Sequence, residues 1–560
     1  MVLDQVTFYL NSYKSKVLHE TFLFTFSAIY FSHSAMYDRL LNWVRREWPS
    51  LLVIGLGVAI QMALITRSLS YLITTVLPDD AFYYFDIARS IVAGHGSTFN
   101  GIDPTNGFHP LWLLVLLPIF KFFYTTAADI TPIRIVLLLA VVLNTMTALF
   151  VLRILARFSK SRWVRSLGMI VWMLNPFLLY ETLNGLETAL ALCVFSIFVL
   201  LALRNEEGSS NSYWLTGLVG GFMVLARIDM VFYLAAYGAW LLFRKGWREW
   251  KHELRTAFTA GCFAAIPIVP WFVWNVLNFH MLLTGAAGME SMVNHQLIIQ
   301  DHGPSFLQLL KAVVYNTQYS LNGLFQLTGM LSIAFAAIGA AVTLVMVRMI
   351  IVPKRIAEFT ITHYLFLGFL VLFIADASIR WTVRSWYFVS FEIFLAILFV
   401  VVADTIFRHI THKRLWACII VGLMLFSFYV DWSKNIREQF ASQSQMYAAA
   451  QWESANLPAG SSIGVFNAGI QEYFSSRIIV DLDGLVNNNV FGAMQRRSLW
   501  QYIKSDKITY IADFDQYITY RYKSFFGIPD PFANLALIYN IGDATTTMRS
   551  INGLNIYTVK

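Results

Sequence analysis

Long runs of apolar residues, separated by short polar or basic segments, fill most of this 560-residue chain and decide what it can fold into. From about residue 50 to residue 77 the chain is nearly all apolar. At about 1.5 Å per residue, such a helix crosses a hydrocarbon core roughly 30 Å thick. Charged residues make up 13% of the chain, against about 25% in a soluble domain. The chain is therefore predicted to be a polytopic α-helical membrane protein.

Further apolar runs follow the first, and each predicts a membrane helix. They lie at about 131–157, 166–181, 185–203, 213–226, 228–244, 256–279, 318–350, 358–376, 386–406 and 415–431. A shorter stretch at 110–126 contains Pro110 and Pro118, and we expect it to re-enter the membrane or to lie at its surface. This gives about eleven transmembrane helices plus one re-entrant or interfacial segment.

Basic clusters between the runs set the expected orientation, because Lys and Arg accumulate in the cytoplasmic loops of membrane proteins. The net charge of +8 therefore reflects topology and not a nucleic-acid-binding surface. Arg45 and Arg46 precede the first run and place the N-terminus in the cytoplasm. Four later clusters are expected on the same side: Arg157, Lys160, Arg162 and Arg165; Arg244, Lys245, Arg248, Lys251 and Arg255; Arg348, Lys354 and Arg355; Arg408, Lys413 and Arg414.

After Val430 the composition becomes that of a water-exposed domain, which the charge pattern places outside the plasma (inner) membrane. A helix is predicted at about 436–455. Strands are predicted up to Val465 and at 477–480, 508–512, 536–539 and 554–559. The expected domains are a cytoplasmic N-terminal extension (1–49), a transmembrane domain (50–431) with a first extracytoplasmic loop (78–109), and a soluble extracytoplasmic α/β domain (432–560).

Five polar segments share the outer face in this topology, which predicts a functional site there. They are 78–109, 181–187, 227–229, 280–304 and 376–384.

The first polar segment opens with two adjacent carboxylates, Asp79 and Asp80, at the end of a membrane helix, where unpaired acids are costly. One interpretation is that they cap the helix that starts there. The other is catalytic: one carboxylate is a general base and the other orients it or binds a cation, because adjacent negative charges raise one of the two pKa values. Asp86 follows Asp79 at nearly the same face of a helix and is a candidate partner.

An ordered series of motifs resembles the GT-C glycosyltransferases, multi-span enzymes that use polyprenyl-phosphate sugars and carry an acidic motif in their first extracytoplasmic loop. The series is most similar to their bacterial arabinofuranosyltransferase-type branch. The matching segments are Asp79-Asp80-Ala81, Gly94-His95-Gly96, Gly107-Phe108-His109-Pro110-Leu111-Trp112, Asn184-Gly185-Leu186-Glu187-Thr188, Ala226-Arg227-Ile228-Asp229 and Asp483-Gly484-Leu485.

The resemblance implies a GT-C fold and a transferase that works on the outer face with a polyprenyl-phosphate sugar as donor. The acceptor would be a hydroxyl of a cell-envelope glycan, a lipid or a protein. Asp79 or Asp80 would deprotonate that hydroxyl, which would attack the anomeric carbon with inversion. Because the leaving group is a phosphate, such a site needs fixed positive charge.

Arg380 and Arg384 are the best candidates for this positive charge, since they are four residues apart and share a face if the segment is helical. The alternative is that they extend to the interface beside Trp381 and Trp386, as in an ordinary aromatic belt.

Further candidate substrate-binding residues have equally simple structural explanations. Arg227 and Asp229 interrupt an apolar stretch and form either a membrane ion pair or part of a substrate cavity, and Glu187 is similar. His95 and His109 either bind phosphate or a sugar hydroxyl or are loop histidines with backbone partners. Residues 280–304 are expected to form a solvated loop that can also place polar groups over the cavity.

No set of Asp, Glu and His has a spacing that requires a metal, but two carboxylates facing a phosphate can hold Mg²⁺ or Mn²⁺, so a divalent cation stays open. Two other classes also remain: a flippase or transporter of lipid-linked sugars, and a catalytically inactive sugar-binding scaffold. The gathering of polar residues at one face, and the lack of an internal repeat, argue against a transporter.

Overall fold

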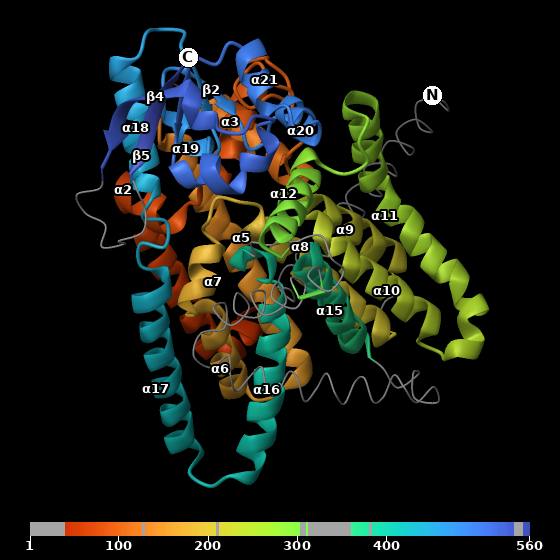
Figure 1. Cartoon of the computed structure of the whole chain (residues 1–560). Helices are drawn as coiled ribbons and strands as arrows, with labels where there is room; N and C mark the ends of the chain where they lie inside the picture. Colours follow the sequence, from red (N-terminus) through yellow and green to blue (C-terminus); the bar gives the residue numbers. More distant parts are fainter. Residues whose placement is uncertain are drawn as a thin grey trace, which may run out of the picture.

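A computed structural model describes residues 38, 40–125, 129–208, 212–302, 310–311, 360–379, 384–542 and 553–560. Among these residues, five helices are long and apolar enough to cross a membrane. They are Leu40–Ile65, α5 (Thr131–Phe158), α8 (Thr188–Glu206), α11 (Trp250–Phe279) and α17 (Lys413–Asp431). Figure 1 shows α5, α8 and α17 beneath the C-terminal sheet and its helices, whereas α11 slants along the right-hand side and reaches up beside them. The predicted span at 318–350 and Arg380 lie outside the described residues.

Seven further helices belong to the described part of the membrane domain. They are α4 (Pro110–Phe123), α6 (Arg162–Met173), α7 (Pro176–Glu181), α9 (Tyr213–Ala226), α10 (Val231–Phe243), α15 (Ile361–Ile379) and α16 (Phe391–His409). The turn between α16 and α17 lies at the end of the molecule opposite the C-terminal domain (Figure 1), and it holds the basic cluster around Lys413.

Two predicted membrane runs differ from the structure. The first helix occupies Leu40–Ile65 instead of residues 50–77, so Arg45 and Arg46 lie within it. Ser68 then caps α2 (Leu69–Tyr71), and a π-helical turn, Leu72–Val76, leads to α3. The run at 166–181 is broken between α6 and α7, because Asn175 caps the second helix and Pro176 cannot continue the first.

The predicted solvated loop at 280–304 is wrong, because most of it forms α12 (Gly285–His302). One side of this helix carries Met289, Val293 and Leu297, which are buried in the same cluster as Phe491 and Met494 of the C-terminal domain. The apolar residues of this face are four positions apart in the sequence. The polar residues between them led to the prediction of a loop.

The C-terminal part forms a five-stranded sheet in the order β2-β1-β3-β5-β4. Its strands are β1 (Ser462–Val465), β2 (Ile478–Asp481), β3 (Tyr510–Asp513), β4 (Leu535–Ile541) and β5 (Leu554–Val559), all at stretches that the sequence pattern indicated. Its helices are α18 (Gln443–Asn456), α19 (Gly469–Phe474), α20 (Asn488–Gln495) and α21 (Leu499–Ser505). β1, β2 and β3 are parallel, whereas β5 is antiparallel to β3 and to β4.

The helix α3 (Asp79–Val92) joins the two parts of the molecule. Tyr83 of α3 donates a hydrogen bond to Asp483, just after β2, and accepts one from the Ala468 backbone, just after β1. The carboxyl ends of the parallel strands therefore face α3. In open α/β sheets this edge is the one that usually binds ligands.

Candidate active site

The two adjacent carboxylates of α3 differ in their hydrogen-bond partners and in their exposure. Asp79 is 7% exposed, and its carboxylate accepts hydrogen bonds from the backbone N–H groups of Gly469 (3.2 Å) and Ile470 (2.7 Å), which begin α19. Pro78, and no acidic side chain, occupies the N-cap of α3 itself. Asp79 therefore caps a helix of the C-terminal domain and not the helix in which it lies.

Asp80 lies on a different side of α3 and is only partly buried. Among the described residues, none donates a hydrogen bond to its carboxylate. Burial raises the pKa of Asp80 above its ordinary value; the positive charges of Arg384 and Arg521 lower it, and the negative charges of Glu290 and Glu187 raise it. Asp80 thus combines an accessible carboxylate with a raised pKa, which are the properties of a general base.

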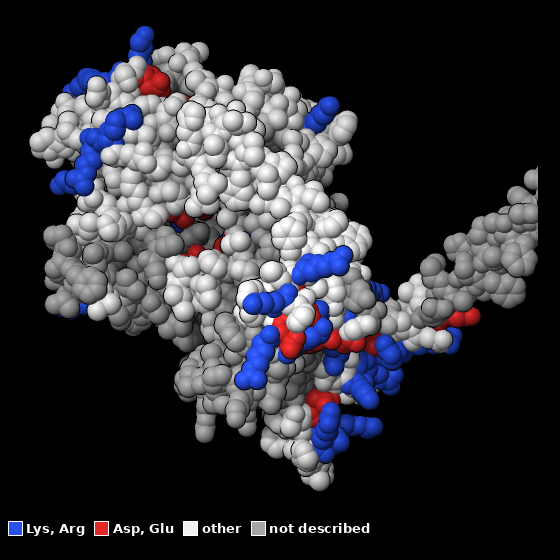
Figure 2. All heavy atoms as spheres, turned by 90° about the vertical axis from the view of Figure 1, so that its right-hand side faces the viewer, with Lys and Arg blue, Asp and Glu red and all other residues white. Residues whose placement is uncertain are grey.

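Two arginines, one from each part of the molecule, act electrostatically on Asp80. Arg384 is exposed, with its guanidinium 5.7 Å from the centre of the Trp386 ring. Arg521 follows the third strand of the C-terminal domain, and its Nε donates a hydrogen bond to the Tyr522 hydroxyl. The positive charges of both arginines lower the pKa of Asp80. Figure 2 shows a hollow below the C-terminal domain with charged side chains inside it.

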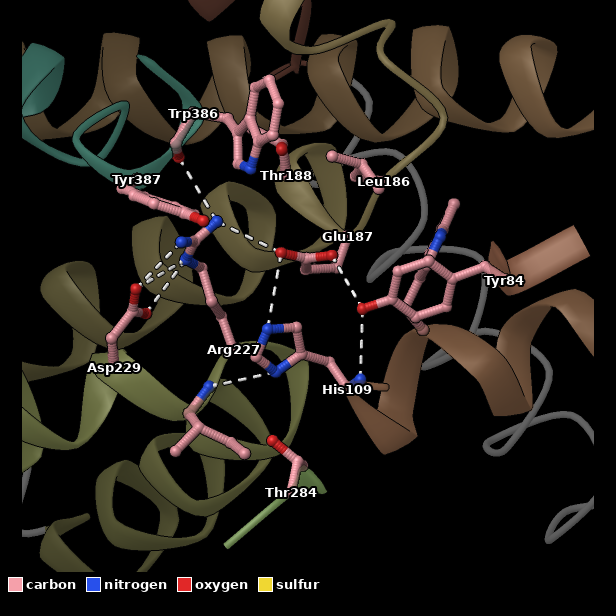
Figure 3. A network of polar contacts seen from close by, with 12 residues as sticks. Tyr84, His109, Leu186, Glu187, Thr188, Arg227, Asp229, Thr284, Trp386 and Tyr387 are labelled. Carbon is pink, nitrogen blue, oxygen red and sulfur yellow. Dashed lines mark hydrogen bonds and ion pairs between the residues drawn. The ribbon is translucent and has the colours of Figure 1, made fainter. Parts of the chain in front are cut away.

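A buried polar network lies beside this space and brings together four predicted site residues (Figure 3). Glu187 is at its centre and accepts hydrogen bonds from Arg227 (3.1 Å) and from the Tyr84 hydroxyl (3.0 Å). Nε2 of His109 lies 3.7 Å from the Glu187 carboxylate. Arg227 also pairs with Asp229 at 2.9 Å.

This network is held by the backbone as well as by charge. Arg227 donates to the Trp386 carbonyl at 3.3 Å, and its guanidinium lies 5.1 Å from the centre of the Tyr387 ring. The Tyr387 hydroxyl donates to Glu290 of α12 at 3.2 Å. Because Arg227 is 3% exposed and has several partners, we interpret it as the fixed part of the site.

Two predicted site residues lie elsewhere. Asp86 is fully buried and forms an ion pair with Arg89 at 3.1 Å; Arg89 also pairs with Glu472 of α19 at 2.7 Å. This cluster connects α3 to the C-terminal domain, so the geometry gives Asp86 a structural role instead of contact with substrate. His95 is exposed beyond the far end of α3, where its ring lies against Gly101.

Buried carboxylates also follow the parallel strands of the C-terminal domain. Burial raises the pKa of Asp481 to about 6 and that of Asp513 to about 7. Asp513 accepts backbone hydrogen bonds from Phe466 and Phe514, each at 2.7 Å. Asp481 accepts backbone hydrogen bonds from residues 483, 484 and 486. These acids shape the loops that hold α3.

Several residues of the site were not predicted from the sequence. Arg521 lies 441 residues from Asp80 in the chain, and no local pattern marks it, so only the docking of the two parts reveals it. Glu290 belongs to the segment 280–304, which was expected to place polar groups over the cavity. Gln443 was also missed: it accepts the Asp79 N–H at 2.7 Å and donates to the Leu77 carbonyl at 2.7 Å. It fixes the start of α3.

Both oxygens of Asp79 accept backbone hydrogen bonds. Among the described residues, no group of three or more His, Cys, Asp or Glu side chains is placed to hold a metal ion.

Comparison with known proteins supports the fold. Residues 434–554 match the family model of a domain of unknown function, DUF8728. No curated protein matches the sequence. The structure of ArnT from Cupriavidus metallidurans bound to undecaprenyl phosphate is similar, with a TM-score of 0.54 and 12% identity over 90% of this chain and 97% of that one. The apo structure of the same protein gives a TM-score of 0.49 at 12% identity, with the same coverage of both chains.

This chain has a fold like that of ArnT over 90% of its length. The similarity supports the membrane fold that the motif series led us to expect, and it does not support the arabinofuranosyltransferase branch.

Proposed function

We propose that this chain is a membrane glycosyltransferase that moves a sugar from a polyprenyl-phosphate donor to an acceptor hydroxyl on the extracytoplasmic face. The observation that carries the proposal is Asp80, a partly exposed carboxylate of raised pKa on which two arginines from different parts of the molecule act electrostatically. A base next to fixed positive charge is what transfer from a phosphate leaving group needs.

The fold supports a lipid-linked donor. The ArnT structure that this chain resembles holds undecaprenyl phosphate. A donor of that class presents its phosphate at the membrane surface, where the membrane helices meet the C-terminal domain. Asp80 lies at the start of α3, where the two parts of the molecule join, and the charges of Arg384 and Arg521 act on it.

The reaction follows from these groups. The acceptor hydroxyl gives its proton to the Asp80 carboxylate while its oxygen forms a bond to the anomeric carbon. The bond between that carbon and the phosphate oxygen breaks on the opposite face, so the configuration inverts. Arg384 and Arg521 stabilise the charge that develops on the departing polyprenyl phosphate.

The Glu187 network then serves substrate binding. His109 is about one quarter exposed, so its ring can reach a sugar hydroxyl while its Nδ1 accepts a 3.4 Å hydrogen bond from the Ile228 N–H. Glu187 and Arg227 are nearly buried and hold His109 and Tyr387 in place.

The motif series makes a pentofuranosyl donor the first to test. That choice rests on the sequence resemblance alone, and the acceptor class of glycan, lipid or protein is open to the same assay. A flippase is the second candidate, because a site at the membrane surface can also hold a lipid-linked sugar during its transfer between leaflets.

One assay separates these functions. Purified full-length protein in nanodiscs is given a panel of polyprenyl-phosphate sugars with mixed acceptors, and free polyprenyl phosphate and glycosylated product are measured. The proposal predicts that both appear in equal amounts for at least one donor. The same protein in closed proteoliposomes tests the alternative: movement of intact donor between leaflets without release of polyprenyl phosphate would replace the proposal with the flippase function. An EDTA arm tests dependence on a divalent cation.

A further inference from the structure

The backbone just before Asp80 is broken between two helical segments, and its polar groups need partners. The π-helical turn Leu72–Val76 ends there, and the chain runs extended through Leu77 and Pro78 before α3 begins at Asp79. The last carbonyls of one helix and the first N–H groups of the next have no partners within those helices. Leaving such groups unpaired in the interior is costly, so their partners decide how this backbone is held.

Residues 439–443, which we call the clasp, supply part of these partners. They lead from the membrane helix α17 into α18, and Figure 1 shows α18 next to α2. The Phe440 N–H donates a hydrogen bond to the Thr74 carbonyl at 2.9 Å. The side-chain amide of Gln439 donates to the Thr75 carbonyl, also at 2.9 Å. The clasp therefore holds the end of the π-helical turn through its backbone.

Gln443 joins the two sides of the break. Its side-chain nitrogen donates to the Ile73 carbonyl at 2.5 Å and to the Leu77 carbonyl at 2.7 Å. Its side-chain oxygen accepts the Asp79 N–H at 2.7 Å. A glutamine amide has two N–H donors and an acceptor oxygen, so one side chain can pair with carbonyls before the break and with an N–H after it. Gln443 thus determines where α3 starts.

The helix α19 holds Asp79 as well. Besides donating two backbone N–H groups to the Asp79 carboxylate, α19 packs directly against its main chain: a Cβ atom at Gly469 would lie 2.4 Å from the Asp79 carbonyl oxygen. Consecutive Cα atoms are about 3.8 Å apart, so the main-chain position of Asp80 follows from that of Asp79. Gln443 and α19 both belong to the C-terminal part of the molecule.

We propose that Gln443 is a positioning residue for Asp80. Through the Asp79 N–H it sets where the Asp80 carboxylate stands relative to the acceptor hydroxyl. The rate of transfer then depends on the junction between α17 and the C-terminal domain. This inference rests on the proposed function, because it gives Gln443 a part in that reaction. A displacement of about 1 Å in a reacting group can cost about 10²-fold in rate.

The test compares two methionine variants of the full-length protein. Gln443→Met keeps the length of the side chain and removes its three hydrogen bonds. Its kcat is expected to fall at least about tenfold, with the KM for the donor changed less than about twofold, because the change displaces the base and not the donor-binding groups.

Gln445→Met is the matched control. Gln443 and Gln445 are 5% and 4% exposed and lie in the same helix, but the Gln445 side chain accepts the Leu554 N–H of β5 at 2.9 Å. Gln445→Met is expected to lower the melting temperature as Gln443→Met does and to keep the wild-type kcat.

Two further measurements separate positioning from stability. Gln443→Glu keeps an oxygen that accepts the Asp79 N–H and is expected to be more active than Gln443→Met, although burying a carboxyl group costs more than burying a thioether. Hydrogen exchange is expected to become faster in residues 73–80 of Gln443→Met and to stay unchanged there in Gln445→Met. If Gln443→Met does not fold, Gln439→Met removes one bond of the clasp and is expected to give a smaller fall in kcat.

Four outcomes would overturn the inference. An equal fall in kcat in Gln443→Met and Gln445→Met would show an effect of stability alone. A wild-type kcat in folded Gln443→Met, or a change confined to the KM for the donor, would remove the positioning role. Unchanged hydrogen exchange in residues 73–80 would contradict the clasp itself, and this measurement needs no turnover. A wild type that releases no polyprenyl phosphate would instead refute the proposed function.

Discussion

At the scale of single residues, neighbouring acids in one motif have separate roles. Consecutive residues of a helix point about 100° apart, so Asp79 turns towards α19 while Asp80 turns towards Arg384. The sequence predicted that one acid is a base and the other a partner. It could not predict that Asp79 caps a helix that begins 390 residues later in the chain.

The proposed role of Asp80 as the base predicts how transfer depends on pH. Because burial raises its pKa, the carboxylate that acts as base is lost at a higher pH than an ordinary aspartate would be. The rate constant kcat/KM is therefore expected to fall as the pH drops, with a midpoint above the usual range of aspartate near 4. Arg384→Gln removes the main charge that lowers this pKa, and its midpoint is expected to lie higher still. A midpoint that stays the same or falls in this variant would contradict the assignment.

Arg227 is the residue whose loss the site should tolerate least. Its replacement by Gln leaves Glu187 and Asp229 buried without their cation, and removing one partner of a buried ion pair destabilises a protein by about 3–5 kcal/mol. We expect Arg227→Gln to lower the melting temperature strongly, as measured by thermal unfolding in detergent. The exposed Arg248→Gln is the matched control, and equal melting temperatures for the two variants would contradict the network.

At the scale of helices and strands, the sequence predicted what depends on local pattern. The five strands and α18 follow from apolar alternation and turn residues. The break before α7 and the helix α12 were missed, because the first depends on one Asn-Pro pair inside an apolar run and the second on burial against the C-terminal domain.

α18 carries a buried acid that makes the C-terminal domain sensitive to pH. Glu453 is fully buried, and burial raises its pKa to about 8. The pKa of Glu453 is higher in the folded protein than in the unfolded protein. Its favourable contribution to the free energy of unfolding is therefore complete below about pH 4.5 and is lost as the pH rises to 8. As the pH rises from about 4.5 to 8, the titration of Glu453 lowers the free energy of unfolding by up to about 1.4 kcal/mol per pH unit.

The variant Glu453→Gln removes this titration. Its free energy of unfolding is expected to change less with pH between 5 and 8 than that of the wild type, as measured by denaturant unfolding at several pH values. Asp530→Asn, an exposed acid of the same domain, is expected to keep the wild-type slope. Identical slopes in wild type and Glu453→Gln would show that Glu453 is ionised in the folded protein.

At the scale of the whole molecule, the site exists only where the two parts meet. Asn106 of the first loop accepts hydrogen bonds from the Gly285 N–H (2.9 Å) and from Asn488 (3.0 Å), which joins α12 and α20 to the membrane domain. The sequence predicted that the polar motifs gather on one side, and Tyr84, His109, Glu187 and Arg227 do so. It could not place Arg521 there, because the docking of the parts depends on contacts between distant segments.

Gly107 tests this docking. A Cβ atom at this position would lie 1.9 Å from the Leu485 carbonyl oxygen, which belongs to the backbone and cannot move aside alone. Gly107→Ala is expected to loosen the C-terminal domain, with faster proteolysis between 432 and 442 and a loss of transfer of at least about tenfold. Gly238→Ala has open space and is the control. Unchanged proteolysis and activity in Gly107→Ala would contradict the contact.

The most direct test of Asp80 as the base measures the release of polyprenyl phosphate from the donor that the wild type uses. It compares the variants Asp80→Asn and Asp79→Asn. Asp80→Asn is expected to keep the wild-type melting temperature and to lose activity by about 10²–10⁴-fold, the usual contribution of a general base. Asp79→Asn is expected to lower the melting temperature and to retain more activity than Asp80→Asn. Full activity in Asp80→Asn, with the protein folded, would show that Asp80 is not the base.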